Sequence, residues 1–216
     1  MPPAELTQLV YAPDVTVRNQ TISAHLRRME TELERTRTTV ASLHRLLEGP
    51  PPSATVTFRT VPATRALGIR AIVSEETGLG WVEEAHHELR AALAAAALRR
   101  AGPDSALFAP EIFEVDEGEI TAYIPVTGHP GGPQPGRVAA IEVPAGELAV
   151  VEHAGPADDL DQAYASLGRV VSQQSIGVTG PLREHYLIGP LDTEDTTAYR
   201  TEVGWPVFRT TEQNPR

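Results

Sequence analysis

The feature that most constrains the fold of this chain is an internal repeat. Val-Pro-Ala occurs at residues 61–63 and again at 143–145, and Gly-Pro occurs at 102–103 and again at 180–181. The tetrapeptide ITAY at 120–123 likewise resembles TTAY at 196–199. The three offsets are 82, 78 and 76 residues, a drift that small deletions in loops would produce. Two such copies are expected to fold into two similar units.

Each copy is predicted to form a strand, a helix and two further strands. In residues 54–127, alternating apolar positions predict one or two strands around Pro62, the Ala-rich run 81–100 predicts a helix, and 107–115 with 119–126 predict a hairpin around 116–118. Residues 137–209 repeat this pattern, with strands in 137–154, a helix over 159–176 and a closing pair at 183–190 and 197–208.

The two copies together predict an α+β fold. Asp158, Asp159 and Asp161 suit the positive end of the second helix, and the Gly/Pro-rich run 128–136 is expected to link the copies. Two such units can pair into one antiparallel sheet with both helices on one face. A cleft between the repeats would be a natural ligand site.

Residues 16–48 precede the repeat and contain no Gly or Pro, which predicts one long helix. Its apolar residues form a narrow heptad seam: Ile22, Leu26, Met29, Leu33, Val40, Leu43 and Leu47. We expect a dimerisation helix, for example in an antiparallel coiled coil. The alternative is an amphipathic helix that lies on its own domain. GPPPS at 49–53 would end the helix and form a stiff hinge, while 1–15 and 210–216 are expected to be a short N-terminal segment and a frayed tail.

The composition excludes several classes of site. There is no cysteine, which removes disulfides and thiolate chemistry, and the formal net charge of −11 disfavours a free-standing nucleic-acid binder. The seven histidines show no metal-binding spacing, and neither a G-x-S-x-G elbow nor a phosphate-binding loop is present. We therefore expect no metal and no cofactor. The absence of a long apolar run and of a signal-peptide pattern predicts a cytoplasmic protein without a membrane partner.

Glu184 is the main candidate for a functional residue. It lies in a strand-like run, GPLREHYLIGP (180–190), and the 78-residue offset aligns it with Ala106 and Tyr186 with Phe108. A buried carboxylate is costly unless it is paired, hydrogen-bonded or protonated. A cationic ligand or a tyrosine hydroxyl would offset that cost. The alternative places Glu184 in solvent on an edge strand, beside Arg183 and His185.

Aromatic residues are the other candidates for ligand contacts, although each could equally be part of a core. Strand alternation places Glu184, Tyr186 and Ile188 on one face. Aromatic rings suit flat or cationic ligands. The candidates are Trp81, Phe108, Tyr123, Tyr164, Tyr186, Tyr199 and Trp205.

The run GPLREHYLIGP, followed by TAYRTEVGWPVF (197–208), resembles the end of a GyrI-like (gyrase-inhibitor-like) effector-binding domain. The repeat fits that family's tandem units, and the helix at 16–48 resembles the dimerisation helix of MerR-type multidrug-responsive regulators. The resemblance implies a drug pocket with Glu184 at its bottom and an aromatic residue at Tyr199. Such a regulator begins with a winged helix-turn-helix, for which residues 1–15 are too few, so DNA is expected as a partner only if that domain is missing from this sequence.

Three functions are therefore open. The first is a sensor of lipophilic, aromatic or cationic drug-like compounds, within a MerR-type regulator or as a stand-alone sequestering homologue that dimerises through 16–48. The second, which the resemblance admits, is a hydrolase of cyclopropane-bearing antibiotics, with Glu184 as acid or base and Tyr186 or Tyr199 polarising the leaving oxygen. The third is a protein-binding inhibitor module, which predicts an exposed apolar patch and no enclosed pocket.

Overall fold

The structure is a computed structural model that describes residues 15–48 and, with gaps at 97 and 129–135, residues 55–209. The predicted hinge, most of the linker, the tail and nearly all of the N-terminal segment therefore lie outside the described residues. The chain divides into two units, residues 1–49 and 50–216, and each is treated by itself.

The first unit contains the predicted long helix, α2 (Val15–Glu48). Five residues of the heptad seam have described side chains, and between 36% and 53% of the surface of each is exposed: Ile22, Leu26, Met29, Leu33 and Val40. The helix is thus present, and these five apolar side chains are exposed. Dimerisation through it stays a prediction.

The second unit contains the two copies. The first copy comprises β1 (Thr57–Val61), β2 (Thr64–Ser74), α3 (Glu75–Ala95), β3 (Arg99–Arg100), β4 (Asp104–Phe108), α4 (Glu111–Glu114) and β5 (Glu117–Thr127). The second comprises β6 (Ala139–Val143), β7 (Gly146–Ala154), the 3₁₀ turn η1 (Ala157–Asp159), α5 (Asp161–Gln174), β8 (Leu182–Ile188), the 3₁₀ turn η2 (Thr196–Ala198) and β9 (Arg200–Val207). This confirms the α+β class.

The order of the strands confirms the repeat. The strands form one antiparallel sheet in the order β1-β7-β9-β8-β4-β5-β2-β6, with β3 added beside β5. In the repeat, β1 corresponds to β6, β2 to β7, β4 to β8 and β5 to β9. Exchanging each strand for its counterpart reverses the order of the sheet without otherwise changing it, so a pseudo-twofold axis passes between β4 and β8. The copies also exchange their first strands, because β1 pairs with β7 and β6 pairs with β2. Pro62 and Pro144 lie at these breaks, where the chain leaves one pairing for another.

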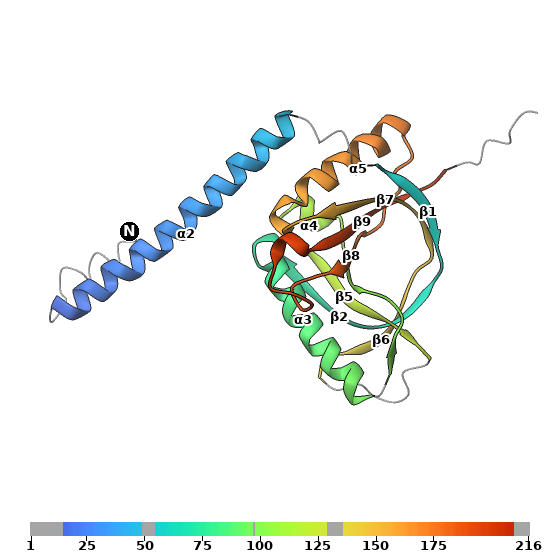
Figure 1. Cartoon of the computed structure of the whole chain (residues 1–216), viewed down its shortest axis with the longest axis horizontal. Helices are drawn as coiled ribbons and strands as arrows, with labels where there is room; N and C mark the ends of the chain where they lie inside the picture. The colour runs from blue at the N-terminus through green and yellow to red at the C-terminus, as the bar shows by residue number, and fades with distance from the viewer. Residues whose placement is uncertain (1–14, 49–54, 97, 129–135, 210–216) are drawn as a thin grey trace, which may run out of the picture. The chain divides into compact units, whose positions relative to one another are not determined.

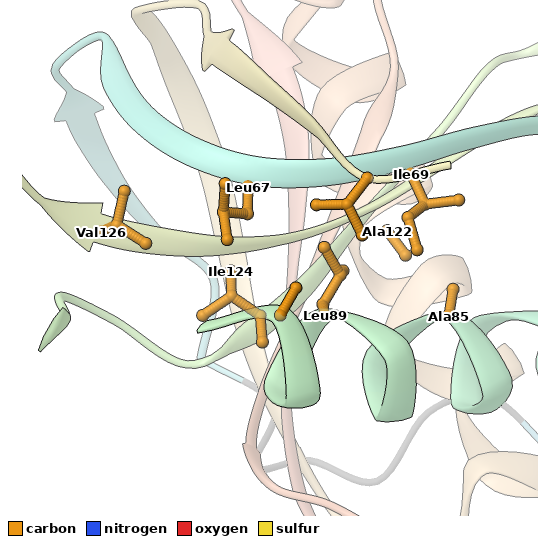
Figure 2. Packing of buried hydrophobic residues seen from close by; sticks show 9 residues of the cluster. Leu67, Ile69, Ala85, Leu89, Ala122, Ile124 and Val126 are labelled. Atoms are coloured by element: carbon orange, nitrogen blue, oxygen red, sulfur yellow. The ribbon is translucent and has the colours of Figure 1, made fainter. Parts of the chain in front are cut away.

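The helices α3 and α5 cover the same face of the sheet (Figure 1). Ala85 and Leu89 of α3 pack on the side chains of β2 and β5, as Figure 2 shows. Leu160, Ala163, Leu167 and Val171, at the start of α5 and along it, pack on β7 and β9 in the same way. Each fully buried Leu, Ile or Val contributes about 1.5–3 kcal/mol to stability. These two apolar layers fix the helices on either side of the pseudo-twofold axis.

Two predicted elements differ from the structure. The strand expected over 107–115 ends at Phe108, and a one-turn helix, α4, follows because Pro110 has no N–H for a strand ladder and instead begins a helix. The helix expected over 81–100 runs from Glu75 to Ala95. Its early start uses Gly78, where a Cβ would lie 3.2 Å from Ile120, so a glycine lets the first turn approach β5 closely.

The alignment of ITAY with TTAY is also wrong. Residues 120–123 lie within β5, whereas Thr196–Ala198 form η2 and Tyr199 precedes β9. Ala106 and Glu184 are counterparts in the repeat. Ala106 pairs with Ala122 of β5, and Glu184 pairs with Val203 of β9. The strands β5 and β9 therefore correspond at an offset of 81 residues, from 122 to 203. The connection before β9 is longer than the one before β5, so residues 196–199 lie in that connection and not in the strand.

Candidate functional site

Glu184 lies in the middle of the sheet and faces the helices. A row of paired residues crosses six strands at this level: Ile69, Ala122, Ala106, Glu184, Val203 and Val151. Glu184 is the one charged member of this row and is only 3% exposed. Its strand, β8, lies between β4 and β9. The alternative in which Glu184 faces solvent on an edge strand is therefore wrong.

Two tyrosines satisfy the two oxygens of this carboxylate. Tyr164 of α5 donates a hydrogen bond to Oε1, and Tyr186 of β8 donates to Oε2 at 2.7 Å. Tyr186 reaches it because residues two apart on a strand share a face, while α5 brings Tyr164 from the layer above. Tyrosine hydroxyls are strong donors to a buried carboxylate. The arrangement is a buried carboxyl group held between two neutral donors.

Burial dominates the electrostatics of this group. Burial raises the pKa of Glu184 above its usual range, and the hydrogen bonds from Tyr164 and Tyr186 act against this rise. The pKa of each tyrosine is held well above its ordinary value by burial and by the charge of Glu184. Both hydroxyls therefore stay protonated at neutral pH and remain donors.

A cavity of about 260 Å³ lies beside Tyr186. One wall is α3, through Leu79, Gly80, Val82, Glu83, His86 and Arg90, and the other is formed by Ile188–Asp192 with Tyr199 and Thr201. Two predicted ligand contacts, Tyr186 and Tyr199, line it, and Glu184 lies one hydrogen bond behind Tyr186. The cavity is a mostly apolar space with a few polar groups, as small-molecule sites commonly are.

Arg90 holds the outer wall of the cavity in place. Its Nε donates to Asp104 Oδ2 at 2.7 Å, its Nη1 to the Leu191 carbonyl at 3.0 Å and its Nη2 to Asp192 Oδ1 at 2.8 Å. Asp192 in turn accepts from the amide of Gly189 at 3.0 Å. One guanidinium thus ties α3 and β4 to residues 189–192. Its release would free that wall.

His86 lines the cavity, although the sequence around it shows no metal-binding spacing and gave no other sign of a site. It is 3% exposed, and the edge of its ring contacts Tyr186 at a centroid distance of 5.6 Å. Its Nε2 lies 3.0 Å from the Ser105 carbonyl, and burial lowers its pKa. The signal for this position is its spacing, because His86 lies four residues after Val82 and three before Leu89, on the inward face of α3.

The other predicted residues fall into two groups. Phe108 belongs to the central core cluster over β4, and Trp81 and Trp205 pack against that cluster together with Tyr164 and Tyr186. Tyr123 lies on the opposite face of the sheet, in a small cluster with Ala66 and Val143, and its ring edge meets His185 at 6.5 Å. Of the candidate aromatics, Tyr164 and Tyr186 therefore contact Glu184 directly, Tyr199 lines the cavity, and Tyr123 lies on the far face of the sheet.

Within the described residues, no group of three or more His, Asp or Glu side chains is arranged to hold a metal ion. Across the same residues, no helix has both the length and the apolar character needed to cross a membrane.

Comparison with known proteins relates the chain to one family. The GyrI-like small molecule binding domain matches residues 54–207. None of the curated proteins matches the chain.

Solved structures share this fold. The EcmrR–DNA complex has a TM-score of 0.65 at 19% identity, over 97% of this chain and 78% of that one. The crystal structure of the EcmrR C-terminal domain has a TM-score of 0.63 at 20% identity, over 73% of this chain and 99% of that one. SAV2435 bound to tetraphenylphosphonium has a TM-score of 0.51 at 18% identity, over 71% and 94%. A hydrolase from Listeria innocua has a TM-score of 0.53 at 13% identity, over 73% and 93%.

The structural matches establish the fold, which is that of the EcmrR C-terminal domain. The sequence match covers the whole repeat. The chain therefore belongs to the family of GyrI-like small-molecule-binding domains, through residues 54–207.

Proposed function

We propose that this chain binds a lipophilic aromatic compound in the cavity beside Tyr186, with Glu184 as its polar anchor, and that cations are favoured. The observation that carries the proposal is the buried Glu184 carboxylate, which accepts a hydrogen bond from Tyr186, a residue that lines the cavity. A structural carboxylate has no evident purpose in this row, since Ala106 fills the equivalent position in the other copy.

Charge supports a preference for cations. A carboxylate in an apolar site is stabilised by any positive charge that replaces lost water. Swinging the Tyr186 side chain aside would expose Glu184 Oε2 to a ligand in the cavity, while Tyr164 would keep Oε1 satisfied. The complex of SAV2435 with tetraphenylphosphonium, a lipophilic cation, supports this ligand class for a protein of the same fold.

The size of the cavity indicates that it opens on binding. Pockets for drug-sized ligands are about 300–1,000 Å³, and the cavity here is about 260 Å³. The wall at 189–192 is the part that can move, because the Arg90 side chain makes two of the contacts that hold it. We expect a large ligand to displace this wall and Tyr186 together.

The helix α2 supports a dimeric regulator-type assembly. Its exposed heptad stripe is suited to a second copy of the same helix. EcmrR, which matches over 97% of this chain, is described in complex with DNA. We propose that two copies join through residues 16–48, with one cavity per chain. The assembly would serve as the sensor part of a MerR-type regulator, or would sequester the ligand as a stand-alone homologue.

A thermal-shift screen tests the proposal. Tetraphenylphosphonium and a panel of polycyclic lipophilic cations would be tested on wild type and on Glu184→Gln. A ligand at 100 times its Kd stabilises the native state by about 2.7 kcal/mol, which corresponds to a rise in Tm of a few degrees for a domain of this size. The expected result is a shift in wild type that is smaller in Glu184→Gln. Equal shifts in both proteins would contradict the role of Glu184.

A hydrolase is the second candidate. The raised pKa of Glu184, caused by burial, suits a general acid or base, and the Listeria innocua hydrolase has a similar fold. Both carboxylate oxygens accept hydrogen bonds from tyrosines, however, and neither is open to a water in the cavity. Mass analysis of the compound recovered after denaturation separates the two functions, because a binder returns it unchanged. The third candidate, a protein-binding module, predicts that no small molecule shifts the Tm.

A further inference from the structure

The two copies differ most in the connections that follow their equivalent strands β4 and β8. Each connection begins with a small residue and a proline, Ala109-Pro110 and Gly189-Pro190. Each then makes the same turn: the amide of Ile112 donates to the Ala109 carbonyl at 3.1 Å, and the amide of Asp192 donates to the Gly189 carbonyl at 2.9 Å. The turns align at an offset of 80 residues (from 109 to 189), so Phe113 corresponds to Thr193.

The first connection places an aromatic ring over one side of the Glu184 site. The ring centroid of Phe113 lies 5.7 Å from that of Tyr164 and 6.4 Å from that of Phe108. Phe113 is nonetheless 49% exposed. It therefore covers the tyrosine that donates to Glu184 Oε1, from a one-turn helix at the surface of the domain.

The second connection leaves a space on the other side. Residues 189–192 lie across the cavity from α3, and Tyr186, which donates to Glu184 Oε2, lines that cavity. Glu184 itself lies at the pseudo-twofold axis, opposite its own counterpart Ala106. The repeat relates Tyr186 to Phe108 at the 78-residue offset, so the side of the site beside Phe108 and Tyr164 corresponds to the side beside Tyr186. A phenyl ring covers the first side, and the second faces a cavity.

We infer that the space beside Phe108 and Tyr164 is a half-site equivalent to the cavity, and that the Phe113 ring fills it. The cavity would bind an uncharged aromatic ring of a ligand against Tyr186, as Phe113 packs against Tyr164. The inference rests on the proposed function and adds two points to it. The first is the chemistry of the group that lies next to Tyr186. The second is a latent site beside Tyr164, which an aromatic compound can enter when Phe113 is absent.

The size of the cavity agrees with this ligand class. An apolar cavity of about 150 Å³ is enough to hold benzene, and the cavity here is about 260 Å³. It therefore has room for one or two aromatic rings without movement of its walls. Aromatic pairs prefer centroid separations of about 4.5–7 Å, the range in which Phe113 and Tyr164 already lie.

Calorimetric titration with indole, a small uncharged aromatic probe, tests the inference on the full chain. Wild type is expected to bind one probe per chain and Phe113→Ala two. Val115→Ala serves as the matched control, because Val115 is in the same connection, is 68% exposed, and should leave the stoichiometry at one. Thr193→Phe is the reciprocal variant. It should fill the cavity and weaken probe binding at least tenfold.

The outcomes separate this inference from the proposed function. One probe per chain in both wild type and Phe113→Ala would overturn the inference and leave the proposed function standing. No probe bound to wild type or to Phe113→Ala would overturn the inference, and binding of tetraphenylphosphonium to the same proteins would show that the proposed function still stands. If circular dichroism shows that Phe113→Ala is unfolded, Thr193→Phe decides, since Phe113 is intact in that variant. Loss of binding there supports the inference, and unchanged binding overturns it.

Discussion

Ala106 and Glu184 are paired across the central strands β4 and β8, and each is the counterpart of the other in the repeat. Such a pair can occur only at the axis that relates the two copies. The same backbone position therefore carries a methyl group in one copy and a carboxylate in the other. The copies share a scaffold, and their difference at this point places one charge at the centre of the domain.

The two tyrosine hydrogen bonds should contribute similarly to stability. Tyr164→Phe and Tyr186→Phe each remove a donor from a buried carboxylate, at an expected cost of about 1–3 kcal/mol in the free energy of unfolding near pH 7. Urea unfolding measures this. Tyr199→Phe is the control, because Tyr199 lines the cavity and no hydrogen bond joins it to Glu184. A loss no greater than that of the control would show that the tyrosines do not hold the carboxylate.

Replacement of Glu184 by Gln should change how stability depends on pH. Burial raises the pKa of Glu184 in the folded state, so the folded protein holds this proton at pH values where the unfolded chain has lost it. Ionisation of Glu184 therefore lowers the stability of wild type as the pH rises above about 4.5. The Tm of Glu184→Gln minus that of wild type should increase by a few degrees between pH 4.5 and 8. A difference that is constant with pH would refute the raised pKa.

His185, on the opposite face, should act in the other direction. Burial, with Arg59 and Arg183 nearby, lowers its pKa from 6.5 to about 4. Between these two pH values the unfolded chain binds a proton at His185 that the folded protein does not. The free energy of unfolding is therefore highest above pH 6.5 and decreases as the pH falls towards 4. We expect a loss of order 2 kcal/mol across this range, and His185→Gln should remove most of it. Denaturant titrations at several pH values test the slope, and NMR titration of the ring locates the pKa itself.

Arg90 should affect both stability and ligand exchange. Arg90→Met leaves the buried Asp104 with Arg100 as its remaining ion-pair partner and releases Asp192. Removal of one partner of a buried pair costs about 3–5 kcal/mol, and the partial exposure of Arg90 reduces the expectation to about 2 kcal/mol. The dissociation rate of a bound ligand should rise, as stopped-flow measurement would show. Arg99→Met is the control, because Arg99 lies on the exposed strand β3. Equal rates in the two variants would contradict the role of Arg90.

The seam of α2 should hold two copies together. Leu26→Glu places a charge at a position that is 53% exposed in the single chain but central in the proposed coiled coil. Light scattering should find a dimer for wild type and a monomer for this variant. Gln20→Glu adds the same charge outside the seam and should stay dimeric. A monomeric wild type would contradict the proposed assembly.

The sequence contained much of this site. Strand alternation placed Glu184 on one face with Tyr186, and the 78-residue offset aligned it with Ala106. That these two counterparts are also paired across the sheet is shown by the structure. Tyr123 was misplaced for a related reason. The ITAY and TTAY letters match, but the connection before β9 is longer, so only Tyr123 lies within a strand, on the face away from the helices. A match of letters could not reveal a difference in loop length.

Two other features depend on packing across distant segments. Phe113 looks like a strand residue in sequence, because the turn that Pro110 begins becomes visible only with the backbone. His86 becomes a cavity residue only when β8 brings Tyr186 beneath α3. Local patterns therefore predict which residues face inward. They do not predict which inward residues meet.

The central claim is that Glu184 anchors a ligand in the cavity, and calorimetric titration with tetraphenylphosphonium tests it most directly. Wild type, Glu184→Gln and His185→Gln form a matched set, because residues 184 and 185 are neighbours on β8 and face opposite sides of the sheet. The account predicts one site per chain in wild type, a loss of at least tenfold in affinity (about 1.4 kcal/mol) for Glu184→Gln, and no loss for His185→Gln. Equal affinities in all three proteins, or no binding in wild type, would contradict it.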